Sequence, residues 1–199
     1  MNRLIFSRTC LLFIVYLFCT SNLSYSKDNS SWLKNNKEGM IAFKERNFIK
    51  AENFYLQAIE EARKSNLDAE LSATLNNLGL LKIELLQYEE SENLIIESLK
   101  LRLKFYKINH RYIAQSYNNL ARVYEHTGRI EESIELYVKA IEVYENLGKR
   151  YSMLLARTLI NLSTVQLNTG LLDVAQINLV RALALSKKYE QDNIVSLSA

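Results

Sequence analysis

The chain has 199 residues, of which 48% are hydrophobic and 24% charged, with five glycines and no proline. Such a composition is too apolar for a disordered protein, and the length is ample for a core. The formal net charge is +3, whereas a protein that binds nucleic acid irrespective of sequence normally carries a large, clustered basic excess. We therefore do not expect nucleic acid as a partner.

The first 26 residues have the three parts of a secretory signal peptide. Arg3 and Arg8 give a positive start, an apolar stretch follows, and Ser24-Tyr25-Ser26 forms a small-residue cleavage site. We therefore expect an exported protein, periplasmic or secreted. The uninterrupted apolar stretch is shorter than the roughly 20 residues that span a bilayer, which favours a cleaved signal. The alternative is an uncleaved membrane anchor over residues 4–19.

The rest of the chain contains a repeat with a spacing of 42 residues. In each copy an asparagine precedes a leucine and a small residue, and two more small residues follow. A less regular copy lies upstream. Because a short repeat cannot bury its apolar face alone, we expect tandem units that stack on one another. The three clear copies are Asn77-Leu78-Gly79 with Ser91 and Ser98, Asn119-Leu120-Ala121 with Ser133 and Ala140, and Asn161-Leu162-Ser163 with Ala175 and Ala182; the upstream copy has Gly39, Ala51 and Ala58.

Each unit is predicted to be a helical hairpin. The later small residues of each unit lie seven apart with a bulky residue between them, which marks one face of a helix. Gly128 and Gly170 suit the end of a preceding helix. No segment after residue 30 has the pattern of a strand. The expected fold is all-α, with a repeat domain at 27–189, a tail at 190–199, and repeats at about 32–65, 69–107, 111–149 and 153–188.

One unit carries a recognisable motif. Tyr117-Asn118-Asn119-Leu120-Ala121-Arg122-Val123-Tyr124, followed by Gly128-Arg129-Ile130-Glu131-Glu132-Ser133, resembles the tetratricopeptide repeat. The 42-residue period with Asn-Asn-Leu resembles the kinesin light chain variety. The resemblance covers roughly residues 32–188 and implies a right-handed α-solenoid of about four repeats. It departs from the pattern in the first unit and in lacking proline at the inter-repeat turns.

No residue pattern indicates an enzyme, a cofactor or a metal site. Cys10 and Cys19 both lie in the signal segment, so the mature chain would have no thiol. His110 and His126 belong to no catalytic or metal-binding motif and are interpreted as solvated residues near helix ends. The basic residues of the segment 100–107 are interpreted as cations near a helix C-terminus, where they are favourable.

The asparagines of the repeat are the candidate binding residues. Asn77, Asn119 and Asn161 occupy equivalent places on successive first helices, and an amide offers two donors and an acceptor to a peptide backbone. The resemblance implies this role, because peptide-binding tetratricopeptide repeats commonly use asparagine there. The alternative is that each asparagine bonds a neighbouring helix or loop. The remaining predicted peptide-binding residues are Asn76, Asn118 and Arg122.

Two functions are compatible with these sequence patterns. The first is an exported adaptor or assembly scaffold that binds a protein or an extended peptide on the concave face of the solenoid. The alternative is a structural subunit that self-associates through the apolar edge of its last repeat. We expect Leu179 and Leu183 to be exposed at that edge, unless a partner or the tail residues 194–197 cover them.

Overall fold

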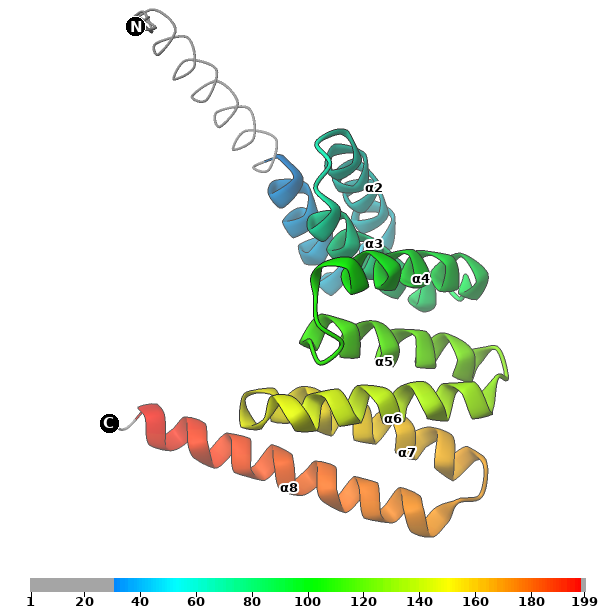
Figure 1. Ribbon diagram of the computed structural model, residues 1–199, viewed down its shortest axis with the longest axis vertical. Coiled ribbons are helices and arrows are strands. Elements are labelled where there is room, and N and C mark those ends of the chain that lie inside the picture. Colours follow the sequence, from blue (N-terminus) through cyan, green and yellow to red (C-terminus); the bar gives the residue numbers. More distant parts are fainter. Residues whose placement is uncertain (1–30, 198–199) are drawn as a thin grey trace, which may run out of the picture. The chain divides into compact units, whose positions relative to one another are not determined.

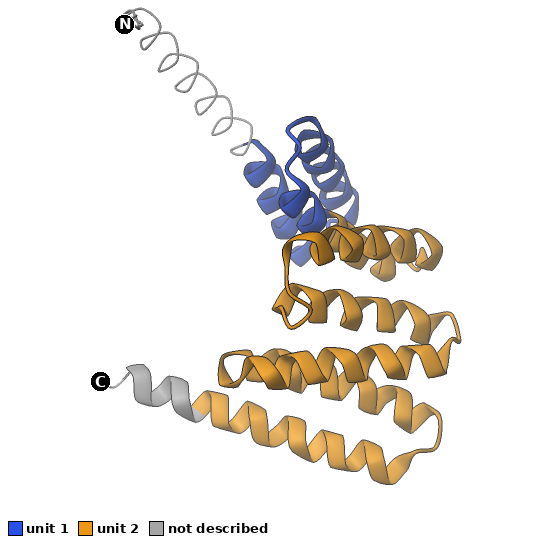
Figure 2. Ribbon diagram, in the orientation of Figure 1, with its two compact units in different colours: residues 1–74 blue, residues 75–199 orange. Residues whose placement is uncertain are grey.

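The computed structural model describes residues 31–197, with side chains as far as residue 190. The predicted signal segment and the alternative anchor lie outside the described residues. The chain divides into two compact units, residues 1–74 and residues 75–199 (Figure 2). No helix among the described residues is long and apolar enough to cross a membrane.

The described chain is helical apart from short turns, as predicted (Figure 1). Residues 194–197 continue the last helix, so the suggestion that they fold back over the final repeat is wrong. The helices are residues 31–44, α2 (Phe48–Lys64), α3 (Asp68–Glu84), α4 (Tyr88–Phe105), α5 (Arg111–His126), α6 (Ile130–Leu147), α7 (Ser152–Asn168) and α8 (Leu172–Leu197), with a 3-10 turn at Lys149–Tyr151.

In unit 1 the small residue of the first helix has to be a glycine. A methyl group added at Gly39 would lie 2.6 Å from ring carbons of Tyr55, so only glycine lets the two helices approach this closely. Tyr55 is almost fully buried, together with Ala51 and Ala58. At the start of unit 1, Trp32 Nε1 donates a hydrogen bond of 2.8 Å to Thr74 Oγ1.

In unit 2 the small residues lie where the two helices of a hairpin meet. A Cβ on Gly79 would be 2.6 Å from Ile95 Cγ1. Ser91 donates a 2.8 Å hydrogen bond to the carbonyl oxygen of Gly79, and Ser133 donates an equal bond to that of Ala121. The predicted small residues therefore set the spacing of the helices and also tie them together. Successive helices from α4 to α8 pack against one another.

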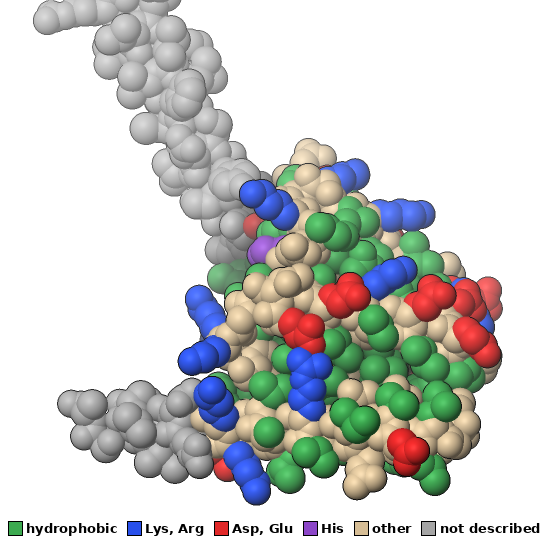
Figure 3. Space-filling view, turned by 60° about the horizontal axis from the view of Figure 1, so that its bottom comes forward, with side chains coloured by type: hydrophobic (Ala, Val, Ile, Leu, Met, Phe, Trp, Pro, Cys, Tyr) green, Lys and Arg blue, Asp and Glu red, His purple; other side chains and the backbone are tan. Residues whose placement is uncertain are grey.

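The last helix, α8, carries exposed hydrophobic side chains on more than one side. Leu179 is 37% exposed and Leu183 is 56% exposed, which confirms the expected apolar edge. Figure 3 shows hydrophobic side chains on the end of unit 2 that carries α8. Further exposed hydrophobic residues of this helix are Leu172, Val174, Ile177 and Val180.

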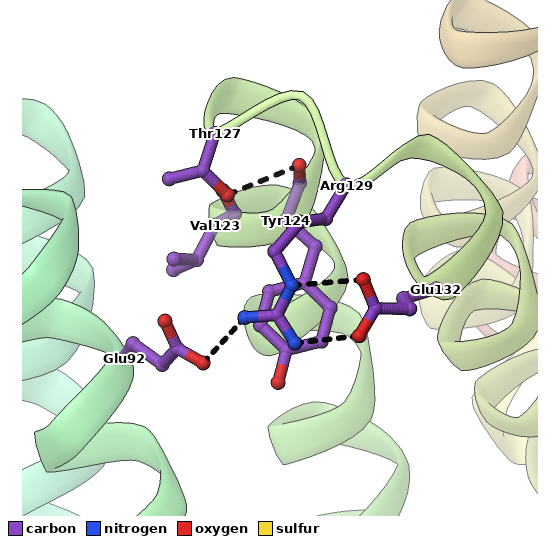
Figure 4. A network of polar contacts seen from close by, with 6 residues as sticks. All are labelled: Glu92, Val123, Tyr124, Thr127, Arg129 and Glu132. Carbon is purple, nitrogen blue, oxygen red and sulfur yellow. Dashed lines mark hydrogen bonds and ion pairs between the residues drawn. The ribbon is translucent and has the colours of Figure 1, made fainter.

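Arg129 joins three helices at the turn between α5 and α6 (Figure 4). Its Nη1 lies 2.8 Å from Glu92 Oε1 on α4, and its Nε and Nη2 lie 2.8 and 2.6 Å from the two carboxylate oxygens of Glu132 on α6. The guanidinium also lies over the ring of Tyr124 on α5, 3.6 Å from its centroid. This planar, forked geometry suits arginine and not lysine.

The turn within each hairpin needs a left-handed residue. Gly128 and Gly170 have φ of 79°, as expected of glycines that end a helix. The equivalent residue of the preceding hairpin is Leu86, whose φ is 60° although its side chain is 70% exposed. Leu86 therefore adopts a strained backbone conformation without gaining much packing.

We expect Leu86→Gly to raise the free energy of unfolding by about 0.5–1 kcal/mol, because relief of backbone strain exceeds the added entropy of the unfolded chain. The reciprocal change, Gly128→Leu, should lower it by about 1–2 kcal/mol. Chemical denaturation of the two variants measures both values. A loss of stability in Leu86→Gly would show that the leucine side chain matters more than its backbone.

Candidate functional site

The six residues predicted to bind peptide lie on α3, α5 and α7. The structure buries three of them, Asn76, Asn118 and Asn119, which are at most 4% exposed. The other three, Asn77, Arg122 and Asn161, are partly exposed. Direct contact with a peptide stays a prediction, and it concerns mainly the three partly exposed residues.

The asparagines form a continuous series of hydrogen bonds across the first helices. Asn161 Nδ2 donates to Asn118 Oδ1 over 3.1 Å, and Asn118 Nδ2 donates to Asn119 Oδ1 over 3.3 Å. Asn119 Nδ2 then donates to Asn76 Oδ1 over 3.1 Å. We call these four residues the asparagine ladder. It links α7 to α5 and α5 to α3. For these residues the structure therefore has the alternative arrangement considered from the sequence, in which an asparagine bonds a neighbouring helix.

Arg102 of α4 completes the asparagine ladder. It is 2% exposed, and its Nη1 donates to Tyr112 O at 2.7 Å and Ser116 Oγ at 2.8 Å on α5, and to Asn76 Oδ1 at 3.3 Å. Burial lowers the pKa of its guanidinium to about 10, so it remains charged at neutral pH. Arg102 lies in the last turn of α4, as interpreted from the sequence for the segment 100–107, but the sequence did not predict its burial.

The network leaves two buried donors without a partner. Asn76 Nδ2 and Arg102 Nε find no hydrogen-bond partner among the described residues. None of the three acceptors of Arg102 Nη1 is a carboxylate. A buried cation bonded to neutral oxygens leaves its positive charge uncompensated by the network itself.

Arg122 is the one predicted binding residue that carries a charge, and it forms an ion pair within the protein. Its Nη2 lies 3.2 Å from Glu84 Oε1 on α3, with both side chains partly exposed. On the same face Tyr137 donates a 3.1 Å hydrogen bond to Glu125 Oε2, and burial strongly raises the pKa of this tyrosine. This end of α5 is therefore balanced in charge.

The opposite end of α5 is different. A hollow of about 240 Å³ lies there, lined by Arg111, Tyr112, Gln115, Tyr144 and Leu154. Burial raises the pKa of the Tyr144 hydroxyl to about 12, against the opposing effect of the positive charges of Arg157, Arg102 and Arg111. No carboxylate belongs to the described lining. The hollow therefore offers hydroxyl, amide and guanidinium donors to an anionic group.

An aromatic cluster supports this end of α5. The ring of His110 stacks on Tyr106 with centroids 4.2 Å apart, and its Nδ1 accepts a 3.3 Å hydrogen bond from the backbone N–H of Tyr112. Burial lowers the pKa of His110, and Arg111 and Arg102 lower it further. His110 lies at a helix end, as interpreted from the sequence, but it is partly buried at the N-cap of α5. His126 is exposed and stacks on Tyr88.

Sequence reasoning missed Arg111, Gln115 and Tyr144. A signal for the first two was present, because residues 111, 115, 118 and 122 recur at spacings of four, three and four and so share one face of α5. No comparable signal marks Tyr144, which comes from α6. Among the described residues, no group of acidic, histidine or cysteine side chains could hold a metal ion.

We expect Asn119→Ala to lower the free energy of unfolding by about 1–3 kcal/mol, because it leaves partners of the asparagine ladder unsatisfied in a buried place. The control is Thr164→Ala on α7, an exposed residue, which should change it by no more than about 0.5 kcal/mol. Denaturant titration provides the comparison. Equal effects of the two variants would show that the ladder contributes nothing to stability.

Known protein families and solved structures include relatives of this chain. The sequence model of the tetratricopeptide repeat matches residues 70–146 and 112–188. No curated protein matches the chain with significance. Together the two matched segments span more than half of the chain.

Solved structures with 16–21% sequence identity share the fold. BtubC (BKLC) from P. vanneervenii has a TM-score of 0.70 at 21% identity, over 78% of this chain and 63% of BtubC. A putative kinesin light chain from Podosopora anserina, with nearly identical TPR-like repeats, has a TM-score of 0.60 at 16% identity, over 79% of this chain and 76% of the other. A Rap protein complexed with Competence and Sporulation Factor has a TM-score of 0.72 at 19% identity, over 80% of this chain and 44% of Rap. The resemblance seen in the sequence is confirmed: the chain belongs to the tetratricopeptide repeat family.

Proposed function

We propose that this protein is an exported scaffold whose unit 2 holds an extended, acidic segment of a partner protein along α5 and α7. Tetratricopeptide repeats are protein-binding scaffolds, and one structural neighbour, the Rap protein, was solved in complex with Competence and Sporulation Factor. The acidic character of the segment and the place where it binds are inferred from this chain's own residues.

The hollow at the start of α5 carries the proposal. Arg111 and Gln115 line it from α5, Tyr144 from α6 and Leu154 from α7. Within unit 2 the hollow is close to the buried charge of Arg102, which acts on Tyr144 and His110. A carboxylate of the partner would receive charge-assisted hydrogen bonds there, which are stronger than neutral ones.

The partly exposed amides extend the site along the same face. Asn161 Nδ2 donates a hydrogen bond to Asn118. The Asn161 amide has a second donor hydrogen on this nitrogen and acceptor capacity at its oxygen. These groups suit the backbone of an extended segment irrespective of its side chains. In this proposal the amides hold the backbone while the hollow selects an acidic side chain.

A library of random peptides displayed on phage, panned against the immobilised full chain, tests the proposal. We expect enrichment of segments rich in Asp and Glu. Arg111→Gln should reduce the retention of an enriched peptide roughly tenfold, since loss of one charge-assisted bond costs about 1.5 kcal/mol. Gln115→Glu should also reduce retention, because it adds a carboxylate that repels the ligand.

The matched control is Lys139→Gln, which removes an exposed cation from α6 and should leave retention unchanged. Circular dichroism establishes that each variant keeps its helices. Enrichment of neutral or basic peptides, or equal retention by Arg111→Gln and Lys139→Gln, would refute the proposed acidic specificity.

Export rests on the pattern of residues 1–26, a charged start followed by an apolar stretch and small residues. In a host with a secretory pathway, we expect the exported product to begin at Lys27, as read by mass spectrometry. Leu12→Arg, which places a charge within the apolar stretch, should block export. Recovery of a membrane-bound product that retains Met1 would favour the anchor over residues 4–19 instead.

A further inference from the structure

A stripe of five exposed residues runs along the outer side of α8. The spacing of these residues, four and three in alternation, places them on one face of the helix. Ile177 and Val180 at its centre are 66% and 62% exposed. We call this set the α8 stripe: Asp173, Ile177, Val180, Ala184 and Lys187.

The α8 stripe is more apolar than the equivalent face of α6. The residues 42 positions earlier are Glu131, Glu135, Val138, Glu142 and Glu145. All five are exposed, so this face of α6 meets solvent. In α8 the two central glutamates are replaced by isoleucine and alanine, which produces a continuous apolar centre.

A following repeat would cover a different side of α8. In α6 the buried side chains include Tyr137, Ile141 and Tyr144, which belong to a core cluster shared with residues of α5 and α7. Their equivalents in α8 are Leu179, Leu183 and Ser186. The α8 stripe lies beside this side and corresponds to the solvent-facing one. Its apolar centre is therefore not explained by stacking between repeats.

The arrangement of charges identifies the occupant. Asp173 lies seven residues before Val180 and Lys187 lies seven residues after it. When two copies of such a helix pack face to face in antiparallel orientation about Val180, each Asp173 meets the Lys187 of the other copy. Ile177 then lies near Ala184 of the other copy, and the two Val180 side chains meet at the centre.

We infer that the α8 stripe is a self-association surface, on which a second copy of this chain docks with its own α8 in antiparallel orientation. A parallel pair would place like charges opposite each other at both ends, which is unfavourable. The paired segment has about four helical turns, about 21 Å long. It buries less than the roughly 1,600 Å² of a standard interface, so a dissociation constant in the roughly micromolar range is expected.

Sedimentation velocity of the full chain over a concentration series through the micromolar range tests this inference. The unmodified chain should shift from monomer to dimer. Val180→Glu places two carboxylates opposite each other at the centre and should weaken association roughly 100-fold. The matched control is Val138→Glu at the equivalent place on α6, where the valine is 40% exposed, and association should be unchanged.

Charge reversal tests the orientation. Asp173→Lys and Lys187→Asp should each weaken self-association, and an equimolar mixture of these two variants should form a heterodimer, because all facing charges are then opposite. The double variant should again form a homodimer. A chain that stays monomeric through the series, or a dimer that survives Val180→Glu, would overturn the inference. A dimer held together by residues 1–26 would survive Val180→Glu. A stripe that binds another kind of protein would leave the chain monomeric.

Discussion

The hydrogen bonds of the buried asparagine ladder govern the arrangement of unit 2. Amides that leave water must find partners inside the protein, because an unsatisfied buried polar group is costly. Here each asparagine bonds an amide on the neighbouring first helix or beside itself on α5, and among the described residues only Asn76 Nδ2 of these amide groups is buried without a partner. A helix shifted by one residue along its neighbour would lose these bonds, so the ladder fixes the register in which apolar packing alone would allow sliding.

This structural duty limits what the same residues can do for a ligand. Asn118 and Asn119 face the interior between helices, while Arg111 and Gln115 on the same helix line an open hollow. One helix therefore performs two tasks along its length: its middle is used to hold the repeats together, and its start remains available to a partner. Arg122 at the other end is engaged by Glu84, which leaves the start of α5 as the more strongly positive place.

Periodicity predicted the fold well because it reports on packing that recurs. The small residues at Gly79, Ser91 and Ser133 lie where helices touch, and any stacked hairpin requires them there. The turns were predicted through Gly128 and Gly170, but Leu86 takes the same left-handed conformation without a sequence signal. In that hairpin the turn between α3 and α4 imposes a backbone conformation that a leucine does not favour. The site was predicted less completely, since it depends on side chains brought together from several helices. Whether an amide of the asparagine column faces solvent or a neighbouring helix depends on the register between helices, and the burial of Arg102 against Tyr112 and Ser116 requires α5 to be in place.

Arg102 has an electrostatic consequence for the whole of unit 2. A guanidinium held rigidly among neutral oxygens is shielded by water and dissolved ions far less than a mobile surface side chain. It therefore acts as a permanent source of positive potential inside the protein, which neither thermal motion of the side chain nor ordinary changes of pH remove. Such a source draws anionic groups toward the adjacent surface before any contact forms, and it would speed their encounter with the protein.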